Sequence, residues 1–257
     1  MPADDLALAL LLADAADALT MQRFLATDLV IDTKPDLTPV SDADRAVETA
    51  LRAMLADERP SDAVLGEEYG ADTSVRGRRW ILDPIDGTKN FIRGVPVWST
   101  LIALAIDDDV MVGVVSAPAL QRRWWAAKGS GAFTQVAGGA PRQISVSGVA
   151  RIADASLSYS DEAGWGERAQ PFTDLRETVW RTRAYGDFWS HMLVAEGAID
   201  IALEPELSLW DIAALVPVVE EAGGSMTGFG GEPALNAQCA VTTNGLLHPF
   251  VLDALQP

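Results

Sequence analysis

The chain has 257 residues, of which 49% are hydrophobic and 22% are charged, a composition typical of a globular protein with a substantial core. Its formal net charge is −18, from 37 acidic and 19 basic residues. This excess of negative charge argues against binding to nucleic acid or to anionic membranes, because both surfaces are recognised by Lys and Arg. Cys239 is the only cysteine, so the chain cannot form an internal disulfide, which suits a reducing compartment.

The first predicted element is a helix over residues 4–26. Its apolar stretch, residues 6–13, is too short to span a bilayer and is followed by acidic residues. No Lys or Arg precedes this stretch, so a secretory signal is not expected. We expect a core helix of a cytoplasmic protein.

A second helix is predicted to begin after Ser41, a good N-cap residue, because apolar residues recur at helical spacing from Val47 to Leu55. Asp44 falls in its first turn. There the carboxylate can complete a capping box with Ser41, and it can also belong to a functional site. A short strand over residues 63–65 follows and ends just before Glu67 and Glu68.

Residues 80–91, WILDPIDGTKNF, carry the strongest functional signal. An apolar strand, predicted over residues 79–82, ends at Asp83 and Asp86, whose carboxylates are the hard oxygen ligands that Mg²⁺ prefers. Pro84 restricts the backbone between them. Gly87 and Thr88 then allow the backbone N–H groups to approach an anion closely. This pattern predicts a divalent-metal site that faces a phosphate.

The strands predicted next lie at residues 100–106, 110–116, 123–127 and 142–147, and the first two should form an antiparallel hairpin around a turn of three aspartates. The second half alternates strand and helix. Strands are predicted at residues 156–159, 199–203 and 240–243, and helices at residues 188–196 and 212–222 and up to residue 255. The fold class is therefore α/β, with an α+β domain at residues 1–148 and an α/β domain at residues 149–257.

Four segments together resemble the inositol monophosphatase family of magnesium-dependent, lithium-sensitive phosphatases. They are KPDLTPVSDAD at residues 34–44, GEE at residues 66–68, the WILDPIDGTKNF segment, and LSLWD at residues 207–211. Their order and spacing follow the family over nearly the whole chain. The resemblance implies a layered αβαβα sandwich, as in inositol monophosphatase and fructose-1,6-bisphosphatase, and a homodimer.

The same resemblance implies a set of metal ligands. Glu67, Asp83 and the carbonyl of Ile85 would hold a first Mg²⁺, and Asp83 would bridge to a second ion held by Asp86 and Asp211. Two to three ions are expected per site, and Mn²⁺ is an alternative ion. Without cations these carboxylates would repel one another strongly, and metals remove that conflict.

The resemblance also implies catalytic roles. A third, more hydrated ion would rest against Glu67 and reach Asp44 through water. The nucleophile would be a metal-bound water, which Thr88 and Asp44 would orient and deprotonate. Asp86 and the N–H groups of Gly87 and Thr88 would bind the phosphate.

The leaving alcohol is expected to contact Asp187 and Glu204. In RAYGDFWSH, residues 183–191, Asp187 stands where inositol-specific members of the family commonly carry a small serine-type residue. Two extra carboxylates suit a cationic alcohol, and the motifs resemble the bacterial histidinol-phosphate phosphatase branch, which works in histidine biosynthesis. Alternatives are inositol-1-phosphate or fructose-1,6-bisphosphate as substrate, a non-catalytic regulatory protein, and a structural calcium site.

Several residues near the motifs keep a second interpretation. Asp187 can be the N-cap of the helix that follows it. We interpret Lys34, Lys89 and Glu68 as solvated side chains, although each lysine can also add positive charge near the phosphate. We interpret His191 as a core residue, and the alternative is that it faces the pocket. Three tryptophans, Trp165, Trp189 and Trp210, are candidates for a pocket wall.

Overall fold

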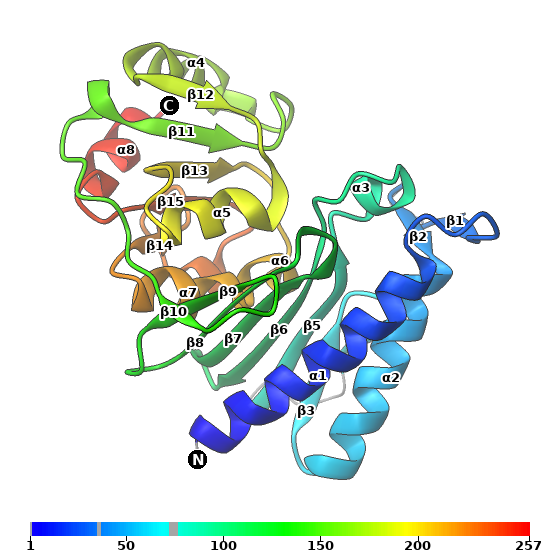
Figure 1. Ribbon diagram of the computed structural model, residues 1–257. Coiled ribbons are helices and arrows are strands. Elements are labelled where there is room, and N and C mark those ends of the chain that lie inside the picture. Colours follow the sequence, from blue (N-terminus) through cyan, green and yellow to red (C-terminus); the bar gives the residue numbers. More distant parts are fainter. Residues whose placement is uncertain (1, 35–36, 72–76) are drawn as a thin grey trace.

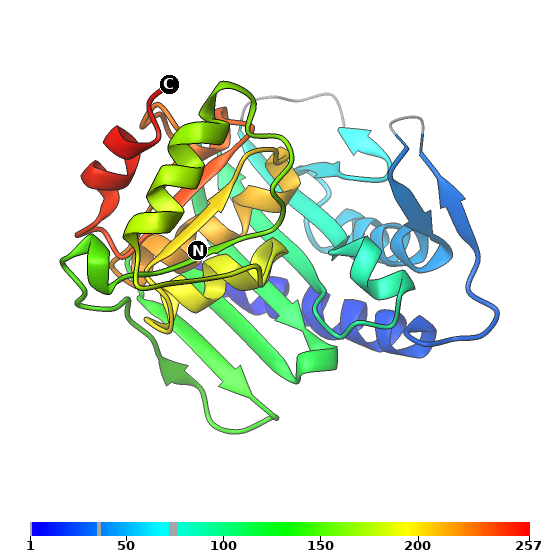
Figure 2. The ribbon, with the colours of Figure 1, turned by 90° about the horizontal axis from the view of Figure 1, so that it is seen from above.

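The computed structural model describes residues 2–34, 37–71 and 77–257. Helices and sheets alternate in five layers, as the two ribbon views show (Figure 1 and Figure 2). The layers are α1 (Pro2–Arg23) with α2 (Asp42–Glu58), an eight-stranded sheet, α5 (Asp187–Ala195) with α6 (Leu209–Ala213) and α7 (Leu215–Glu221), a five-stranded sheet, and α4 (Ala169–Thr178) with α8 (His248–Ala254). The predicted αβαβα sandwich is confirmed.

The large sheet has the strand order β10-β9-β8-β7-β6-β5-β3-β4. Its strands are β3 (Ala63–Gly66), β4 (Gly70–Ala71), β5 (Arg78–Asp86), β6 (Ser99–Ile106), β7 (Asp109–Ala117), β8 (Arg122–Ala127), β9 (Ala132–Val136) and β10 (Arg142–Gln143). β3 and β5 are parallel, whereas the other neighbours are antiparallel. The predicted hairpin of β6 and β7 is confirmed.

Both faces of the large sheet are buried, and successive residues of a strand pack into different cores. Trp80 and Leu82 of β5 contact the core that includes α1 and α2. Ile81, between them, contacts the core that includes α6 and α7. Because side chains alternate along a strand, a central strand covered on both faces is apolar at nearly every position. This explains the unbroken apolar run of β6.

The small sheet has the order β12-β11-β13-β15-β14. Its strands are β11 (Ser156–Tyr159), β12 (Arg181–Arg183), β13 (Ile201–Glu204), β14 (Ser225–Thr227) and β15 (Ala240–Thr243). β11 is parallel to both β12 and β13, so the carboxyl ends of β11 and β13 meet at one edge. The remaining elements are β1 (Ile31–Thr33), β2 (Pro39–Ser41), α3 (Thr88–Ile92) and 3-10 turns at Pro118–Leu120, Ile152–Asp154, Gly166–Arg168 and Ala234–Asn236.

Some predicted boundaries were wrong for identifiable reasons. The first helix ends at Arg23 instead of residue 26, because Leu25 has a φ of 64°, outside the helical region. The strand predicted at residues 142–147 stops at Gln143, after which Val146 donates to the carbonyl of Ala222 at the end of α7. β9, which precedes it, was not predicted.

The helix predicted at residues 212–222 is two helices, α6 and α7, which meet at Ala214. Pro217 has no N–H to donate to the carbonyl of Ala213, so the helical hydrogen-bond ladder is interrupted there. α6 also begins earlier than predicted, at Leu209, and it therefore includes Asp211.

The domain boundary near residue 148 stays a prediction. All strands of the large sheet, and the separate antiparallel pair β1–β2, precede that residue, whereas all strands of the small sheet follow it. However, α6 and α7 come from the second half of the chain and pack on the large sheet. The two halves therefore share the middle helical layer. Among the described residues, no helix combines the length and apolar character that crossing a membrane requires.

Replacing Gly113 by Ala should destabilise the fold. A Cβ at Gly113, in β7, would lie 2.2 Å from the carbonyl oxygen of Ala214 and 2.6 Å from Cγ of Pro217. We expect the free energy of unfolding to fall by roughly 1–3 kcal/mol, as for other overpacked cores. Urea denaturation measures this change. Gly148→Ala, where a Cβ would meet open space, is the matched control, and equal losses in the two variants would contradict this packing.

Candidate active site

A β-bulge at the end of β5 brings two carboxylates to the same side of the strand. Asp83 pairs with Leu101 and Asp86 pairs with Ser99. An advance of three residues along β5 therefore matches an advance of only two residues along β6. In a regular strand, residues three apart point to opposite faces, and the extra residue of the bulge removes this difference. The hydroxyl of Thr100 donates to the carbonyl of Pro84 at 2.8 Å and stabilises the bulge.

α6 adds a third carboxylate. One oxygen from each of Asp83, Asp86 and Asp211 lies within 4.8 Å of the other two, and we call these three residues the aspartate cluster. The backbone N–H of Ser208 donates to Oδ2 of Asp211 at 2.7 Å, as in a capping box. This bond orients the Asp211 side chain on a short helix that packs directly against the large sheet.

The aspartate cluster carries an unfavourable concentration of negative charge. Burial, followed by the neighbouring carboxylates, raises the pKa of Asp83 and of Asp86 well above its ordinary value. The pKa of Asp211 is raised to about 6, mainly by burial. Oδ1 of Asp83 is buried and has no hydrogen-bond partner among the residues that the structure describes. Hard oxygen donors, mutual repulsion and an unpartnered oxygen are the features of a site for divalent cations.

Glu67 lies beside the aspartate cluster but binds a lysine. β3 and β5 are parallel, and the N–H of Glu67 donates to the carbonyl of Leu82 at 3.2 Å, which brings Glu67 next to Asp83. Nζ of Lys34 lies 2.6 Å from Oε1 of Glu67 and 2.6 Å from Oε1 of Glu68. The carboxylate of Glu67 is thus not among the three clustered oxygens, and its role as a ligand stays a prediction.

The interpretation of Lys34 and Glu68 as solvated side chains was wrong. Their side chains are only 17% and 5% exposed, respectively. Burial by itself would lower the pKa of Lys34, but the carboxylates of Glu67 and Glu68 outweigh it and raise this pKa. Lys34 therefore supplies a positive charge next to the aspartate cluster. Pro35 and Asp36, from the same sequence motif, lie outside the described residues.

Thr88 connects Asp44 to the end of β5. Its hydroxyl lies 3.3 Å from Oδ1 of Asp44 and 3.0 Å from the carbonyl oxygen of Ile85. Oδ2 of Asp44 accepts hydrogen bonds from the N–H and the hydroxyl of Ser41, at 2.8 and 2.5 Å. Burial raises the pKa of Asp44. The capping-box interpretation of Asp44 is therefore correct, and its second oxygen still faces Thr88.

Gly87 lies at the turn between β5 and α3. Its φ of 83° belongs to the left-handed region that glycine adopts without strain. A Cβ there would also lie 3.1 Å from the carbonyl oxygen of Val97. The phosphate-binding roles of Asp86, Gly87 and Thr88 stay predictions.

Asp187 is not an N-cap, contrary to one interpretation of the sequence. The N-cap of α5 is Gly186, and Asp187 is the first helical residue, with a φ of 48°. Oδ2 of Asp187 accepts a hydrogen bond from Nδ2 of Asn90 at 3.0 Å. Oδ2 of Asp86 instead accepts from the N–H of Phe188 at 2.9 Å. An acid of the aspartate cluster thus stabilises the start of α5.

Glu204 is buried at the end of β13. Its Oε1 accepts a hydrogen bond of 2.5 Å from the hydroxyl of Ser160. Burial raises the pKa of Glu204 to about 8. Ser160 was not identified from the sequence. Its position directly after a predicted strand was a usable signal, because the ends of parallel strands are common binding positions.

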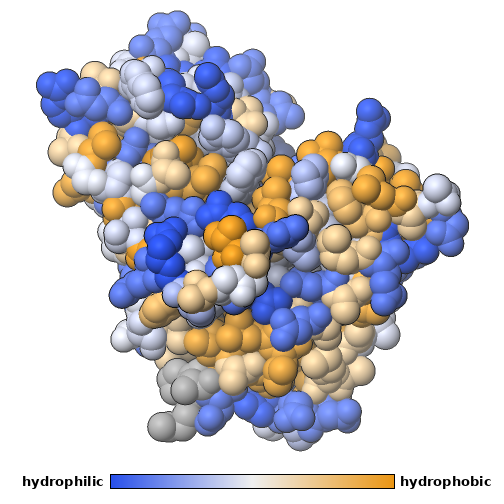
Figure 3. Space-filling view, viewed as in Figure 1, coloured by the Kyte–Doolittle hydropathy of each residue, from blue (hydrophilic) through white to orange (hydrophobic). Residues whose placement is uncertain are grey.

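Two adjoining cavities, of about 470 and 640 Å³, form a cleft over these residues. Both cavities are lined by Thr38, Lys89, Ser160, Asp161, Asp187 and Asp211. The space-filling view shows the cleft as the notch between the C-terminal part and the lobe that carries α3 (Figure 3). The exposed Lys89 thus contacts the cleft, as does Trp210, whereas Trp165 is buried in the core of the small sheet.

His191 is both a core residue and part of the cleft wall. It is 1% exposed, and its Nδ1 lies 2.8 Å from the hydroxyl oxygen of Thr242. It also lines the smaller cavity. Burial lowers the pKa of His191 to about 4, so the ring is neutral at physiological pH.

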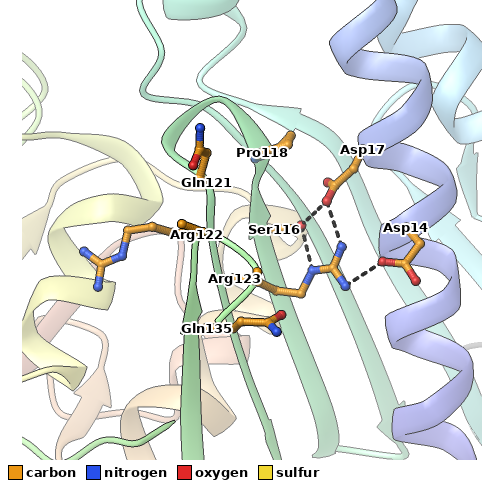
Figure 4. A pocket seen from close by; sticks show the side chains of 10 residues that line it. Asp14, Asp17, Ser116, Pro118, Gln121, Arg122, Arg123 and Gln135 are labelled. Carbon is orange, nitrogen blue, oxygen red and sulfur yellow. Dashed lines mark hydrogen bonds and ion pairs between the residues drawn. The ribbon is translucent and has the colours of Figure 1, made fainter. Parts of the chain in front are cut away.

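Another hollow, of about 350 Å³, lies between α1 and the edge of the large sheet (Figure 4). Three of its charged groups bind each other, whereas Arg122 pairs with Glu196 outside the hollow. Arg123 forms ion pairs of 2.8 Å with Asp14 and 2.7 Å with Asp17, and the hydroxyl of Ser116 also donates to Asp17 at 2.8 Å. None of the predicted site residues lines this hollow. It fastens α1 to the sheet and offers no comparable chemistry.

The family model described as "Inositol monophosphatase family" matches residues 3–256. The chain belongs to this family. Membership confirms the resemblance seen in the sequence motifs and makes the chain a phosphoric monoester hydrolase of a metal-dependent family.

Similar proteins and a similar structure cover almost the whole chain. A histidinol-phosphatase of Mycobacterium tuberculosis is 61% identical over 99% of both chains, and one of Streptomyces coelicolor is 54% identical over 98% of this chain and 97% of that protein. An inositol monophosphatase from Zymomonas mobilis superposes with a TM-score of 0.85 at 33% identity, over 98% of this chain and 97% of that one.

The metal-free protein should become less stable as the pH rises from about 6.5 to about 8.5. Glu204 keeps its proton in the folded state up to about pH 8, whereas an unfolded Glu is already ionised, so the folded state binds more protons in this window. His191 opposes this trend near pH 6.5, because an unfolded His is still about half protonated there while the buried ring is neutral, and it is neutral in both states above about pH 7.5. Thermal unfolding in EDTA measures the effect. Glu204→Gln should weaken the pH dependence, and a midpoint that rises with pH would contradict the assignment.

Proposed function

We propose that this protein is a Mg²⁺-dependent histidinol-phosphatase, which converts L-histidinol phosphate and water to L-histidinol and phosphate. The observation that carries the proposal is the acidic character of the cleft beside the aspartate cluster. Asp187, Glu204, Asp161 and Glu206 line its smaller cavity. The two histidinol-phosphatases that are 61% and 54% identical over nearly their full length support the same substrate.

The chain's own residues suit two to three Mg²⁺ ions, with Mn²⁺ as an alternative. Asp83, Asp86 and Asp211 would be the principal ligands, joined by the carbonyl of Ile85 and by Glu67. Bound Mg²⁺ would neutralise the phosphoryl oxygens and lower the pKa of a coordinated water. The raised pKa values of the aspartate cluster support this assignment, because cations would allow all three carboxylates to ionise together.

Thr88 and Asp44 would orient the attacking water and take its proton. Oδ2 of Asp44 is engaged by Ser41, whereas Oδ1 contacts the hydroxyl of Thr88 and can accept a proton. The N–H groups of Gly87 and Thr88 would hold the phosphate while Asp86 keeps α5 in place through Phe188.

The leaving alcohol would be recognised by charge. L-histidinol carries an ammonium group and an imidazole, and carboxylates form their strongest hydrogen bonds with such cationic donors. A cation placed next to Glu204 would favour its ionised form, which burial alone disfavours. A neutral alcohol, such as inositol, would bring no positive charge to balance the negative charge of these buried carboxylates.

The proposed setting is histidine biosynthesis in the cytoplasm, with the protein acting as a homodimer on a small soluble phosphate monoester. The net charge of −18 supports the absence of nucleic-acid and membrane partners. Size-exclusion chromatography with light scattering tests the homodimer.

A substrate panel tests the proposed activity. We expect kcat/KM with Mg²⁺ to be at least roughly a hundredfold higher for L-histidinol phosphate than for inositol 1-phosphate or fructose 1,6-bisphosphate, because the two charged contacts, to Asp187 and Glu204, can each contribute about 1.5–3 kcal/mol. Phosphate release is measured with and without Li⁺. Faster hydrolysis of either competing substrate would overturn the assignment and identify the activity.

Asp83→Asn should abolish turnover without unfolding the protein. We expect kcat to fall by more than roughly a hundredfold, because a shared metal ligand is lost. In EDTA the variant should be at least as stable as the wild type, since one of three repelling carboxylates is removed. Asp108→Asn, in the exposed β6–β7 turn, is the control. Retained activity in Asp83→Asn would show that the site is misassigned.

A further inference from the structure

We propose that Asn90 is a positioning residue that selects for a cationic leaving alcohol by holding the carboxylate of Asp187 in the cleft. This inference rests on the proposed function and extends it to a residue outside the expected catalytic and binding set. The contact joins α3, on the phosphate side of the cleft, to the start of α5, on the leaving-group side.

Both protons of the Asn90 side-chain amide are engaged. Nδ2 donates to Oδ2 of Asp187 at 3.0 Å and to the carbonyl oxygen of Val97 at 2.9 Å. The Val97 bond fixes the amide on the segment that leads into β6. The amide is therefore held in place before any ligand arrives, with its second proton directed at Asp187.

Asp187 is held from three directions. Its N–H donates to the hydroxyl oxygen of Ser160 at 2.8 Å, and its φ of 48° places the residue in a backbone region that Asp tolerates better than most residues. A Cβ on Gly87 would lie 3.4 Å from Oδ2, so this oxygen packs against the turn after β5. With Oδ2 engaged by Asn90, Oδ1 is the oxygen left to contact a ligand in the cleft.

The hydrogen-bond donor that orients Asp187 is neutral. Burial raises the pKa of Asp187, and the charge of the exposed Lys89, which lines the same cleft, only partly opposes this rise. An Arg or Lys in the place of Asn90 would hold the carboxylate equally well but would cancel its charge. An amide orients the carboxylate and leaves its negative charge available to a cation in the cleft. Ser160 has the same relation to Glu204, because its neutral hydroxyl engages Oε1. Each leaving-group carboxylate is therefore oriented by an uncharged donor.

The two bonds of Asn90 predict separable effects. Loss of the Val97 bond should loosen the segment before β6 and lower kcat/KM by the same factor for all substrates. Loss of the Asp187 bond should lower kcat/KM only for substrates that interact with the charge of Asp187. The ratio of kcat/KM for L-histidinol phosphate to kcat/KM for glycerol 2-phosphate, whose alcohol is neutral, isolates the second effect.

A double-mutant cycle with Asn90→Ala and Asp187→Ser tests the proposal. We expect Asn90→Ala to lower the ratio roughly tenfold, as for loss of a hydrogen bond to a charged group, with most of the change in KM. In the Asp187→Ser background, Asn90→Ala should leave the ratio unchanged, because the carboxylate it positions is gone. Asn90→Ser provides a smaller change if the alanine variant does not fold.

Equal losses on the two substrates would overturn the proposal, as would a change in the ratio that persists in the Asp187→Ser background. A wild-type enzyme that prefers a neutral alcohol would contradict the proposed function instead. In that case the Asn90–Asp187 contact is tested by thermal unfolding of the four proteins of the cycle, which are the wild type, the two single variants and the double variant. Non-additive losses of stability support the contact, and additive losses reject it.

Discussion

The active-site region depends on one electrostatic constraint: several carboxylates lie close together in a partly desolvated cleft. The bulge of β5 and the first turn of α6 bring Asp83, Asp86 and Asp211 together, and burial with mutual repulsion raises their pKa values. Nearby, Lys34 provides positive charge to Glu67 and Glu68. Positive charge is thus a structural requirement of this cleft, and divalent cations are the natural means of meeting it.

The same acids also hold the cleft together. Asp44 and Asp211 each use one oxygen to accept from the backbone of a preceding serine, at the start of α2 and α6. Asp86 accepts from the N–H of Phe188 at the start of α5. Because a carboxylate has two oxygens, each acid can stabilise a helix start with one and contact the cleft with the other. Stability and function are therefore coupled at these positions.

Prediction from sequence succeeded where the signal was local. The apolar runs of β5 to β8 and the Ser41 cap identified real elements, and the WILDPIDGTKNF segment identified the turn that carries two members of the aspartate cluster. It failed where distant packing decides. Lys34 and Glu68 looked solvated, but Lys34, directly after β1, and Glu68, two residues after β3, form a largely buried ion pair between segments far apart in the sequence. The break between α6 and α7 was likewise missed, although Pro217 signalled it.

The sequence by itself determined many of the strands and helices, through periodicity and turn chemistry. It also determined the family, the layered fold and the three aspartates that converge, through the resemblance of its ordered motifs to that family. Only the tertiary structure decided which oxygen of each acid is engaged and by what. That Asn90 binds Asp187 depends on segments 97 residues apart meeting across the cleft. That Ser160 binds Glu204, 44 residues further along the chain, depends on the pairing of the neighbouring strands β11 and β13. Hydrogen bonds act over about 3 Å, so such partners are set by the packing of whole layers and leave no local pattern in the chain.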